Sequence, residues 1–246
     1  MLITTPAVIL QAFAYGDTSR IVRLATQDHG VQSVIAKGAM RPRSQFGGRL
    51  QVLSEGVAQF HYRSTRDLHT LSAFDVTDQH VVLAGDLRRF AAAAALAELV
   101  LRTGHEEPQP VAFATLVETL RALGAAPSER VGLVSLAGLW HMVIVLGFAP
   151  VVDQCVRCER PLGDRSWFAL AEGGLLCPAC GRGTGTGALG AEDQAALRAF
   201  LEGSDAGVAL PAPHVAAHRR LLVRFVRRHL TDDAQLPALS FWESIG

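Results

Sequence analysis

The sequence predicts an α+β protein in which a small N-terminal β-barrel precedes an all-α domain. Short segments of alternating apolar residues fill the first eighty positions, helix-type periodicity begins after Asp78, and all four cysteines lie in the second half. With 246 residues, of which 49% are hydrophobic and 19% charged, the chain can bury a core and is not disordered. We expect a barrel domain at 1–80 and a helical domain at 81–246.

Five predicted strands are separated by turn formers such as Gly16-Asp17, Gly30 and Ser64-Thr65. Five strands in this length are enough for a small closed barrel, and the oligonucleotide-binding (OB) barrel is the commonest such design. An SH3-like barrel is the alternative. The strands are expected at 7–13, 19–26, 31–37, 56–62 and 68–76.

Helix start and stop signals follow the barrel. Asp86 can cap a helix that ends at Gly104, placed as a C′ glycine, and a second helix ends at Gly124. A third helix opens at Ser128-Glu129 and stops at Gly147. The glycine-rich stretch 181–190 is typical of a flexible connector. Two further helices are expected, at 191–202 and 214–230.

Cysteine spacing supplies the most specific motif in the chain. Cys155-Val-Arg-Cys158 and Cys177-Pro-Ala-Cys180 are two C-x₂-C pairs separated by eighteen residues. Each pair places two thiolates on one tight turn, and two pairs at this separation can form the tetrahedron of sulfurs that Zn²⁺ accepts. Gly181, with access to positive φ, should favour the second turn, whereas Glu159 makes the first turn less ideal. We predict one structural Zn²⁺ bound by all four cysteines, in a module at 151–182 inserted in the helical domain.

Other interpretations of the cysteines fit less well. Disulfides suit a secreted chain, but the residues after Met1 show no signal peptide. Thioredoxin-type redox chemistry needs a C-x-x-C that opens a helix after a strand, and a zinc deaminase needs an H-x-E motif where His141-Met-Val143 has no carboxylate. Because four protein ligands leave no coordination position for a substrate water, the metal indicates a folded module and not a catalytic centre.

The segment 37–49 combines cations with an aromatic residue and contains no acid. Cations attract phosphates, aromatic faces stack on bases, and a glycine-rich loop at the rim of a barrel can present both. We therefore predict a nucleic-acid-binding surface, with ordinary solvated charge as the alternative. The candidate residues are Lys37, Arg41, Arg43, Phe46 and Arg49 in this segment, with Arg20, Arg23, Arg63 and Arg66 on neighbouring strands or loops.

The predicted helix 214–230 is also basic, with five arginines and no acid. Its apolar residues recur at helical spacing, which separates an apolar face from a cationic one. A solvated amphipathic face is the alternative to a binding role. The possible second basic surface consists of Arg219, Arg220, Arg224, Arg227 and Arg228.

Catalytic motifs do not accompany these surfaces. The sequence has no P-loop, no G-x-G-x-x-G, no G-x-S-x-G and no carboxylate cluster suited to two-metal chemistry. The longest apolar run, 90–101, is interrupted by Glu98 and falls short of the ~20 residues of a membrane span. We expect a soluble, cytoplasmic protein that is not an enzyme and does not contact a membrane.

Four segments carry a resemblance to a known family. They are SRIVRLATQDHG at 19–30, AKGAMRPRS at 36–44, LGFAP at 146–150, and the four cysteines that close in CPACG at 177–181. Their order and spacing resemble the bacterial RecO recombination-mediator and DNA-repair family, over most of the chain from about Thr5 to Gly181.

The resemblance implies an OB barrel, a helical C-terminal domain and a zinc module that only some members retain. It implies a nucleoid-associated protein that binds single- and double-stranded DNA, anneals complementary strands, and works with RecR to load RecA onto DNA coated by single-strand binding protein. It places the family's basic loop at Lys37, Arg41 and Arg43. A zinc-containing scaffold that binds only proteins is the alternative function.

Overall fold

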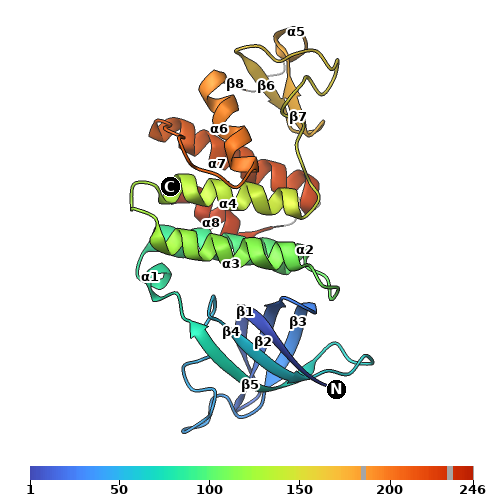
Figure 1. Cartoon of the computed structure of the whole chain (residues 1–246), viewed down its shortest axis with the longest axis vertical. Coiled ribbons are helices and arrows are strands. Elements are labelled where there is room, and N and C mark those ends of the chain that lie inside the picture. The colour runs from blue at the N-terminus through green and yellow to red at the C-terminus, as the bar shows by residue number, and fades with distance from the viewer. Residues whose placement is uncertain (184–186, 232–234, 246) are drawn as a thin grey trace. The chain divides into compact units, whose positions relative to one another are not determined.

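The computed structural model describes residues 1–183, 187–231 and 235–245 of the chain. The chain divides into two compact units (Figure 1). Met1–Ala125 holds the barrel and the three helices that follow it, and Ala126–Gly246 holds the later helices and the cysteine module.

Five strands form a closed barrel in the order β1-β2-β3-β5-β4. Neighbouring strands are antiparallel except β3 and β5, which run parallel where Val34 pairs with His69. This order and the single parallel pairing identify the barrel as OB-type and rule out the SH3-like alternative. The predicted strands are confirmed with small shifts in their ends, except that the first is much longer than expected. The strands are β1 (Leu2–Tyr15), β2 (Ser19–Thr26), β3 (Gly30–Ala36), β4 (Glu55–His61) and β5 (His69–Asp78).

The additional length of β1 comes with a β-bulge between Ile9 and Gln11. Before the bulge, Ala7 and Ile9 belong to the buried barrel core, and after it Ala12 packs against the same core. A bulge inserts one residue and so shifts the alternation of side chains by one position. The bulge therefore lets β1 continue to Tyr15 with Ala12, and not Gln11, facing the core.

Three helices belong to the first unit: α1 (Val81–Ala84), α2 (Leu87–Thr103) and α3 (Pro110–Ala125). The Asp86 side chain accepts hydrogen bonds from the backbone N–H of Arg88 at 2.9 Å and of Arg89 at 3.1 Å, which confirms the predicted N-cap. The buried Arg89 side chain donates to the carbonyl of Leu123. Gly124, expected to end α3, lies within the helix.

The end of α2 lies directly against the turn between β2 and β3. Gly104 follows α2 in an extended conformation (φ −69°), so the expectation of a left-handed C′ glycine is wrong. Glycine is needed there because a Cβ would lie 2.3 Å from Cγ2 of Val31. On the barrel side, a Cβ on Gly30 would lie 2.2 Å from the carbonyl oxygen of His105, which accepts a hydrogen bond from Val31 N at 2.8 Å.

The second unit is built on four helices, α4 (Val131–Val145), α6 (Ala191–Leu201), α7 (Ala212–Leu230) and α8 (Pro237–Ser244). Trp140 on α4 is fully buried and its ring centroid lies 5.3 Å from that of Phe225 on α7. A Cβ on Gly132 of α4 would lie 3.5 Å from Cγ1 of Val215 on α7, an ordinary van der Waals distance, so this helix contact does not require glycine.

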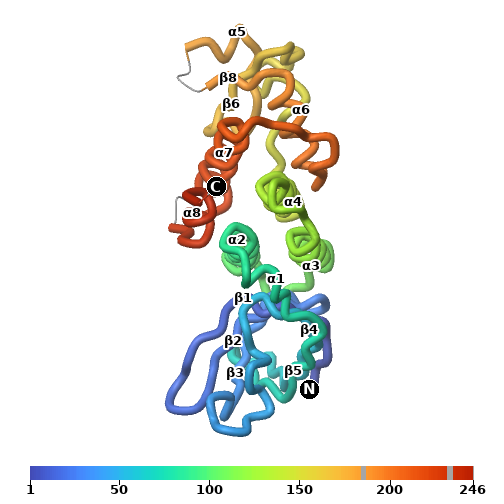
Figure 2. Tube along the Cα trace, turned by 90° about the vertical axis from the view of Figure 1, so that its left-hand side faces the viewer, coloured from blue at the N-terminus to red at the C-terminus, as the bar shows by residue number. Residues whose placement is uncertain are grey.

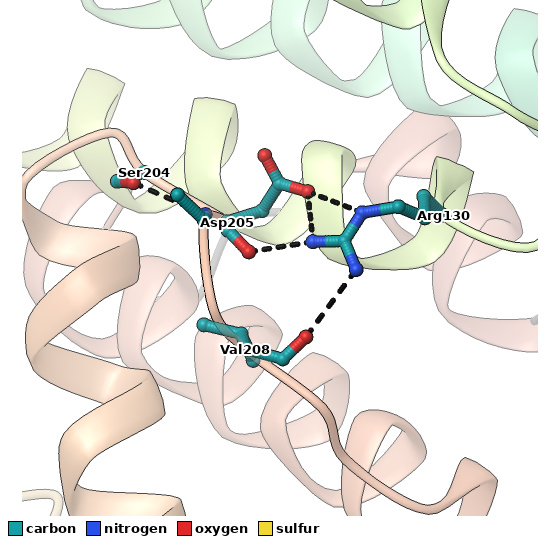
Figure 3. A network of polar contacts seen from close by, with 5 residues as sticks. Arg130, Ser204, Asp205 and Val208 are labelled. Atoms are coloured by element: carbon teal, nitrogen blue, oxygen red, sulfur yellow. Dashed lines mark hydrogen bonds and ion pairs between the residues drawn. The ribbon is translucent and has the colours of Figure 1, made fainter.

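Arg130 fixes the start of α4 to the loop between α6 and α7 (Figure 3). Its guanidinium donates to the Asp205 carboxylate at 2.9 and 2.5 Å, to the Asp205 carbonyl at 2.6 Å and to the Val208 carbonyl at 3.4 Å. The preceding residues form turns, so α4 begins later than the predicted opening at Ser128-Glu129.

The cysteine module contains a small sheet of order β7-β6-β8, with β6 at Ser166–Ala169, β7 at Gly174–Leu176 and β8 at Ala188–Leu189. A single helical turn, α5 (Pro178–Gly181), follows β7. Part of the predicted connector 181–190 is thus ordered, since Ala188 pairs with Trp167 of β6. Residues 184–186 lie outside the described residues.

Candidate metal centre and nucleic-acid interface

The four cysteines converge on one point of the module. Cys155 and Cys158 lie in the turn that precedes β6, and Cys177 and Cys180 lie at the end of β7 and in α5. Their four sulfur atoms all lie within 4.8 Å of one another, and Cys158 Sγ is 3.7 Å from Cys177 Sγ. This donor set could hold one metal ion, as the spacing predicts.

The two cysteine turns differ from their predicted geometry. Glu159 itself adopts the left-handed conformation (φ +58°) and donates its N–H to the Cys155 carbonyl at 2.8 Å. Gly181 makes the equivalent bond to the Cys177 carbonyl at 2.9 Å without a positive φ. Glycine is required at 181 because a Cβ would lie 2.7 Å from Cε3 of Trp167. The role assigned to Gly181 was therefore wrong, since close packing and not backbone freedom selects it.

Hydrogen bonding gives the thiols unequal proton affinities. Burial raises the pKa of Cys155, but N–H donors from Cys177, Arg157 and Cys158 outweigh burial and lower the pKa to about 6. Hydrogen bonding with Cys158, aided by burial, raises the pKa of Cys180 to about 12. A cation among the sulfurs would displace the remaining protons, because thiolates are the metal ligands.

Arg157 joins the two cysteine turns on the surface of the module. Its guanidinium donates to the Glu172 carboxylate at 2.5 and 3.2 Å and to the Cys180 carbonyl at 3.3 Å. Both side chains are substantially exposed, so the ion pair itself adds little stability. The hydrogen bond to the Cys180 carbonyl nevertheless links the first cysteine turn directly to the second.

The loop between β3 and β4, residues 37–54, is anchored to the barrel. Phe46 is 4% exposed and Leu50 is 2% exposed, and both belong to the barrel core. Gln45 donates to the Ser72 carbonyl at 2.9 Å, and Arg20 donates to the Leu50 carbonyl at 3.1 Å. The prediction that Phe46 stacks on bases is wrong. The loop has few apolar residues, and the Phe46 ring is buried in the barrel core, where it anchors the loop.

The predicted cations of the barrel fall into two groups. Arg20 and Arg49 have internal partners, since Arg49 lies 3.8 Å from the Asp75 carboxylate, and Arg23 is half-buried on β2. The second group is exposed, and its side chains have no hydrogen-bond or ion-pair partner among the residues that the structure describes. These residues are Lys37, Arg41, Arg43, Arg63 and Arg66.

The basic helix α7 is also divided by its packing. Arg219 is 6% exposed and its guanidinium lies 5.0 Å from the ring centroid of Trp242, so it does not belong to a basic surface. Arg227 is half-buried and donates to Ser240 Oγ at 2.6 Å. The exposed cations of α7 are Arg220, Arg224 and Arg228.

A cavity of about 490 Å³ lies beside α7 within the second unit. Its apolar lining comes from the module strands and from Leu221, and Arg220 and Arg224 line its cationic side. On one wall, Asp193 Oδ1 lies 2.9 Å from His214 Nδ1 and 3.2 Å from the buried His218 Nε2. The apolar lining residues include Phe168, Leu170, Ala188 and Leu189.

Exposed aromatic residues that the sequence analysis missed lie on β1. Phe13 is 44% exposed and Tyr15 is 53% exposed. The pattern Phe13-Ala-Tyr15 next to the turn Gly16-Asp17 was the available signal, because alternate residues of a strand share a face. Because the first strand was expected to end at residue 13, Tyr15 was not placed on the same strand face as Phe13.

Within residues 1–183, 187–231 and 235–245, no helix has both the length and the hydropathy needed to cross a membrane.

Comparisons with known proteins agree on one family. The model described as "Recombination protein O N terminal" matches residues 1–80, and the one described as "Recombination protein O C terminal" matches residues 84–236. A protein of Salinibacter ruber named DNA repair protein RecO is 36% identical over 250 residues, which cover 95% of this chain and 90% of that protein. Proteins of the same name from Anaeromyxobacter dehalogenans strain 2CP-C and Anaeromyxobacter sp. strain Fw109-5 are 35% and 33% identical, each covering 97% of this chain and 95% and 94% of their own. The chain therefore belongs to the RecO family, which acts in recombinational DNA repair.

Proposed function

We propose that this protein is a recombination mediator, not an enzyme, that binds single- and double-stranded DNA through the loop between β3 and β4. One observation carries the proposal. The side chains of Lys37, Arg41 and Arg43 are exposed and, among the described residues, have no hydrogen-bond or ion-pair partner, while Phe46 and Leu50 fix the loop to the barrel. Cations that no internal carboxylate neutralises keep their full charge for phosphates.

The arrangement favours contacts with the DNA backbone over contacts with base edges. Phosphate contacts position a protein on DNA without reading its sequence. A mediator that anneals complementary strands of any sequence must bind DNA independently of its sequence. Arg63 and Arg66, exposed in the loop before β5, extend the same basic region of the barrel.

Salt-dependent titration of labelled oligonucleotides tests this proposal. Arg41→Ala with Arg43→Ala should weaken binding to all sequences alike and flatten the salt dependence by about 0.7 per lost phosphate contact on single strands. Arg88→Ala with Arg102→Ala removes the same charge from exposed positions of α2 and should change neither. The proposal fails if the loop variant retains the wild-type affinity and salt slope.

The four cysteines, in this proposal, bind one structural Zn²⁺. Four sulfur donors within 4.8 Å of one another suit a tetrahedral site in which every ligand comes from the protein. The metal would then stabilise the module and would not activate a substrate. Metal analysis of the purified protein should give one Zn²⁺ per chain, and a substoichiometric or iron-containing preparation would contradict this assignment.

The proposed partners are RecR, single-strand binding protein and, through RecR, RecA. The cavity beside α7 supports docking of the acidic, phenylalanine-ending tail of single-strand binding protein. Arg220 and Arg224 could pair with its carboxylates, and the apolar lining could receive its aromatic end. Reversing Arg220 and Arg224 to Glu should abolish binding of a tail peptide in fluorescence anisotropy and leave short oligonucleotides bound. If the peptide binds while no DNA does, the alternative of a zinc-containing protein scaffold replaces the mediator.

A further inference from the structure

Strands β1, β2 and β3 lie next to one another in the wall of the barrel (Figure 2). Two aromatic side chains on β1 are exposed on the outside of this wall. Phe13 and Tyr15 lie two residues apart on β1 and are 44% and 53% exposed. Large aromatic side chains are expensive to leave in water unless a ligand covers them. The interface described above leaves both rings unused.

The β-bulge between Ile9 and Gln11 determines which way these rings point. Ile9 and Ala12, on either side of it, both contribute to the barrel core. The residues that alternate with Ala12 must therefore face outward, and they include Phe13 and Tyr15. Without the inserted residue, the strand would turn both rings toward a core that has no room for them.

Neighbouring strands continue the same outward face. Phe13 pairs with Ile21 of β2, which pairs with Ile35 of β3, and both isoleucines are half-exposed. Val22 and Val34, which alternate with them, lie in the core. We call the outward set Phe13, Tyr15, Ile21 and Ile35 the aromatic platform.

Cations flank the aromatic platform. Arg23 pairs with Gln11 on one side and Ser33 on the other, and the exposed Lys37 directly follows β3. The outward positions of the three strands around the platform hold no acid among the described residues, and the nearest in sequence is Asp17 in the β1–β2 turn. An apolar floor with a cationic border suits a flexible polyanion whose bases can stack, and it suits a protein surface less well.

We propose that the aromatic platform stacks the bases of single-stranded DNA. The inference rests on the DNA-binding function proposed above and extends it, with the loop cations holding phosphates while Phe13 and Tyr15 receive bases. The two residues are about 6.8 Å apart along the strand, so each ring can take a separate base. Duplex DNA, whose bases are already stacked, gains nothing from the platform, which makes the protein prefer single strands.

Binding to an oligothymidylate and to a base-free deoxyribose-phosphate oligomer of the same length tests the proposal. The two ligands carry the same charge, so their affinity ratio reports on the bases. Wild type should bind the oligothymidylate about tenfold or more tightly. Phe13→Leu with Tyr15→Leu, which keeps apolar side chains but removes the aromatic faces, should bring the ratio close to one.

Two control variants test whether the effect is specific to the aromatic rings of the platform. Phe241→Ala removes an equally exposed ring (43%) from α8 and should keep the ratio. Phe13→Tyr with Tyr15→Phe preserves both rings and should also keep the affinity ratio, and equal melting temperatures would show that all variants fold.

If wild type binds both ligands equally, or the leucine variant retains the wild-type ratio, the platform does not stack bases. If wild type binds neither ligand, the DNA-binding function itself fails. If the leucine variant loses RecR while its DNA ratio is unchanged, the platform is a protein interface.

Discussion

The barrel and the cysteine module both consist mainly of antiparallel strand pairs, but we expect different interactions to stabilise them. The barrel closes around a continuous core that includes Phe46, Phe60 and Phe74. The module strands β6, β7 and β8 have four, three and two residues, and sheets this small are not stable by themselves. Besides a few buried apolar side chains such as Phe168 and Leu175, the module brings four sulfur atoms within 4.8 Å of one another. If the proposed metal binds, stability is distributed over many contacts in the barrel and concentrated on four metal ligands in the module.

Removing a metal ligand should produce the largest effect. Structural zinc sites contribute an apparent binding energy of about 10–16 kcal/mol in small peptides, so Cys177→Ser should abolish zinc retention and unfold residues 151–182. Limited proteolysis should then cut the module and leave the barrel intact and able to bind DNA. Chelation of the wild type should reproduce this pattern. Unchanged melting of a metal-free chain would show that the module does not depend on zinc.

A core truncation in the barrel should cost less than loss of the metal. Phe46→Ala removes a buried ring and should lower the free energy of unfolding by about 3–5 kcal/mol, measured by urea denaturation. The matched change Phe13→Ala removes an exposed ring and should alter stability by no more than about 0.5 kcal/mol. Equal losses in the two variants would mean that Phe46 does not anchor the loop.

The residues that follow the two C-x₂-C pairs, Glu159 and Gly181, should differ in how their substitution affects the stability of the module. Gly181→Ala forces a Cβ against Trp167 and should destabilise the module by about 1–3 kcal/mol. Glu159→Gly relieves a left-handed conformation and should be neutral or slightly stabilising. Thermal denaturation of the zinc-loaded protein measures both. A neutral Gly181→Ala would show that the Trp167 contact can relax.

The smallest effect should be a pH dependence within the second unit. Burial lowers the pKa of His218, and the nearby Asp193 carboxylate only partly offsets this effect. The pKa of Asp193 is also lowered: burial alone would raise it, but the hydrogen bond from His214 and the positive charges of His218 and His214 outweigh burial. Because both groups have depressed pKa values in the folded state, each stabilises the fold at higher pH and loses this contribution as pH falls. Melting temperature should thus drop from about pH 7 toward acid, and His218→Gln should make the drop shallower. An unchanged slope would exclude His218 as its source.

Much of the fold follows from local sequence signals. Alternation located all five strands, and Asp86 located the start of α2, because both signals depend on neighbouring residues alone. The convergence of the four cysteines was equally predictable, because it follows from the spacing of the two C-x₂-C pairs. The buried Arg219 could also have been predicted, because it lies three and seven residues before Leu222 and Val226 on the apolar stripe of α7.

The remaining errors arose where tertiary contacts decide the outcome. Composition cannot tell whether the aromatic residue of a basic loop faces solvent or core, so Phe46 was assigned to the wrong side. The bulge in β1 depends on the pairing with β2, which no local pattern reveals, and it hid Phe13 and Tyr15. Gly104 and Gly181 were explained by backbone freedom when close neighbours select them.

The contact between Gly30 and the segment that follows α2 has a mechanical consequence. At Gly30 main chain meets main chain, because a Cβ there would lie 2.2 Å from the His105 carbonyl oxygen, and the Val31 N–H donates to the same carbonyl. Such a contact has no flexible side chains to absorb displacement. Tension from a DNA strand held by the barrel would pass into α2 without a compliant linker, although the two family models meet between residues 80 and 84. A boundary in sequence homology need not be a hinge.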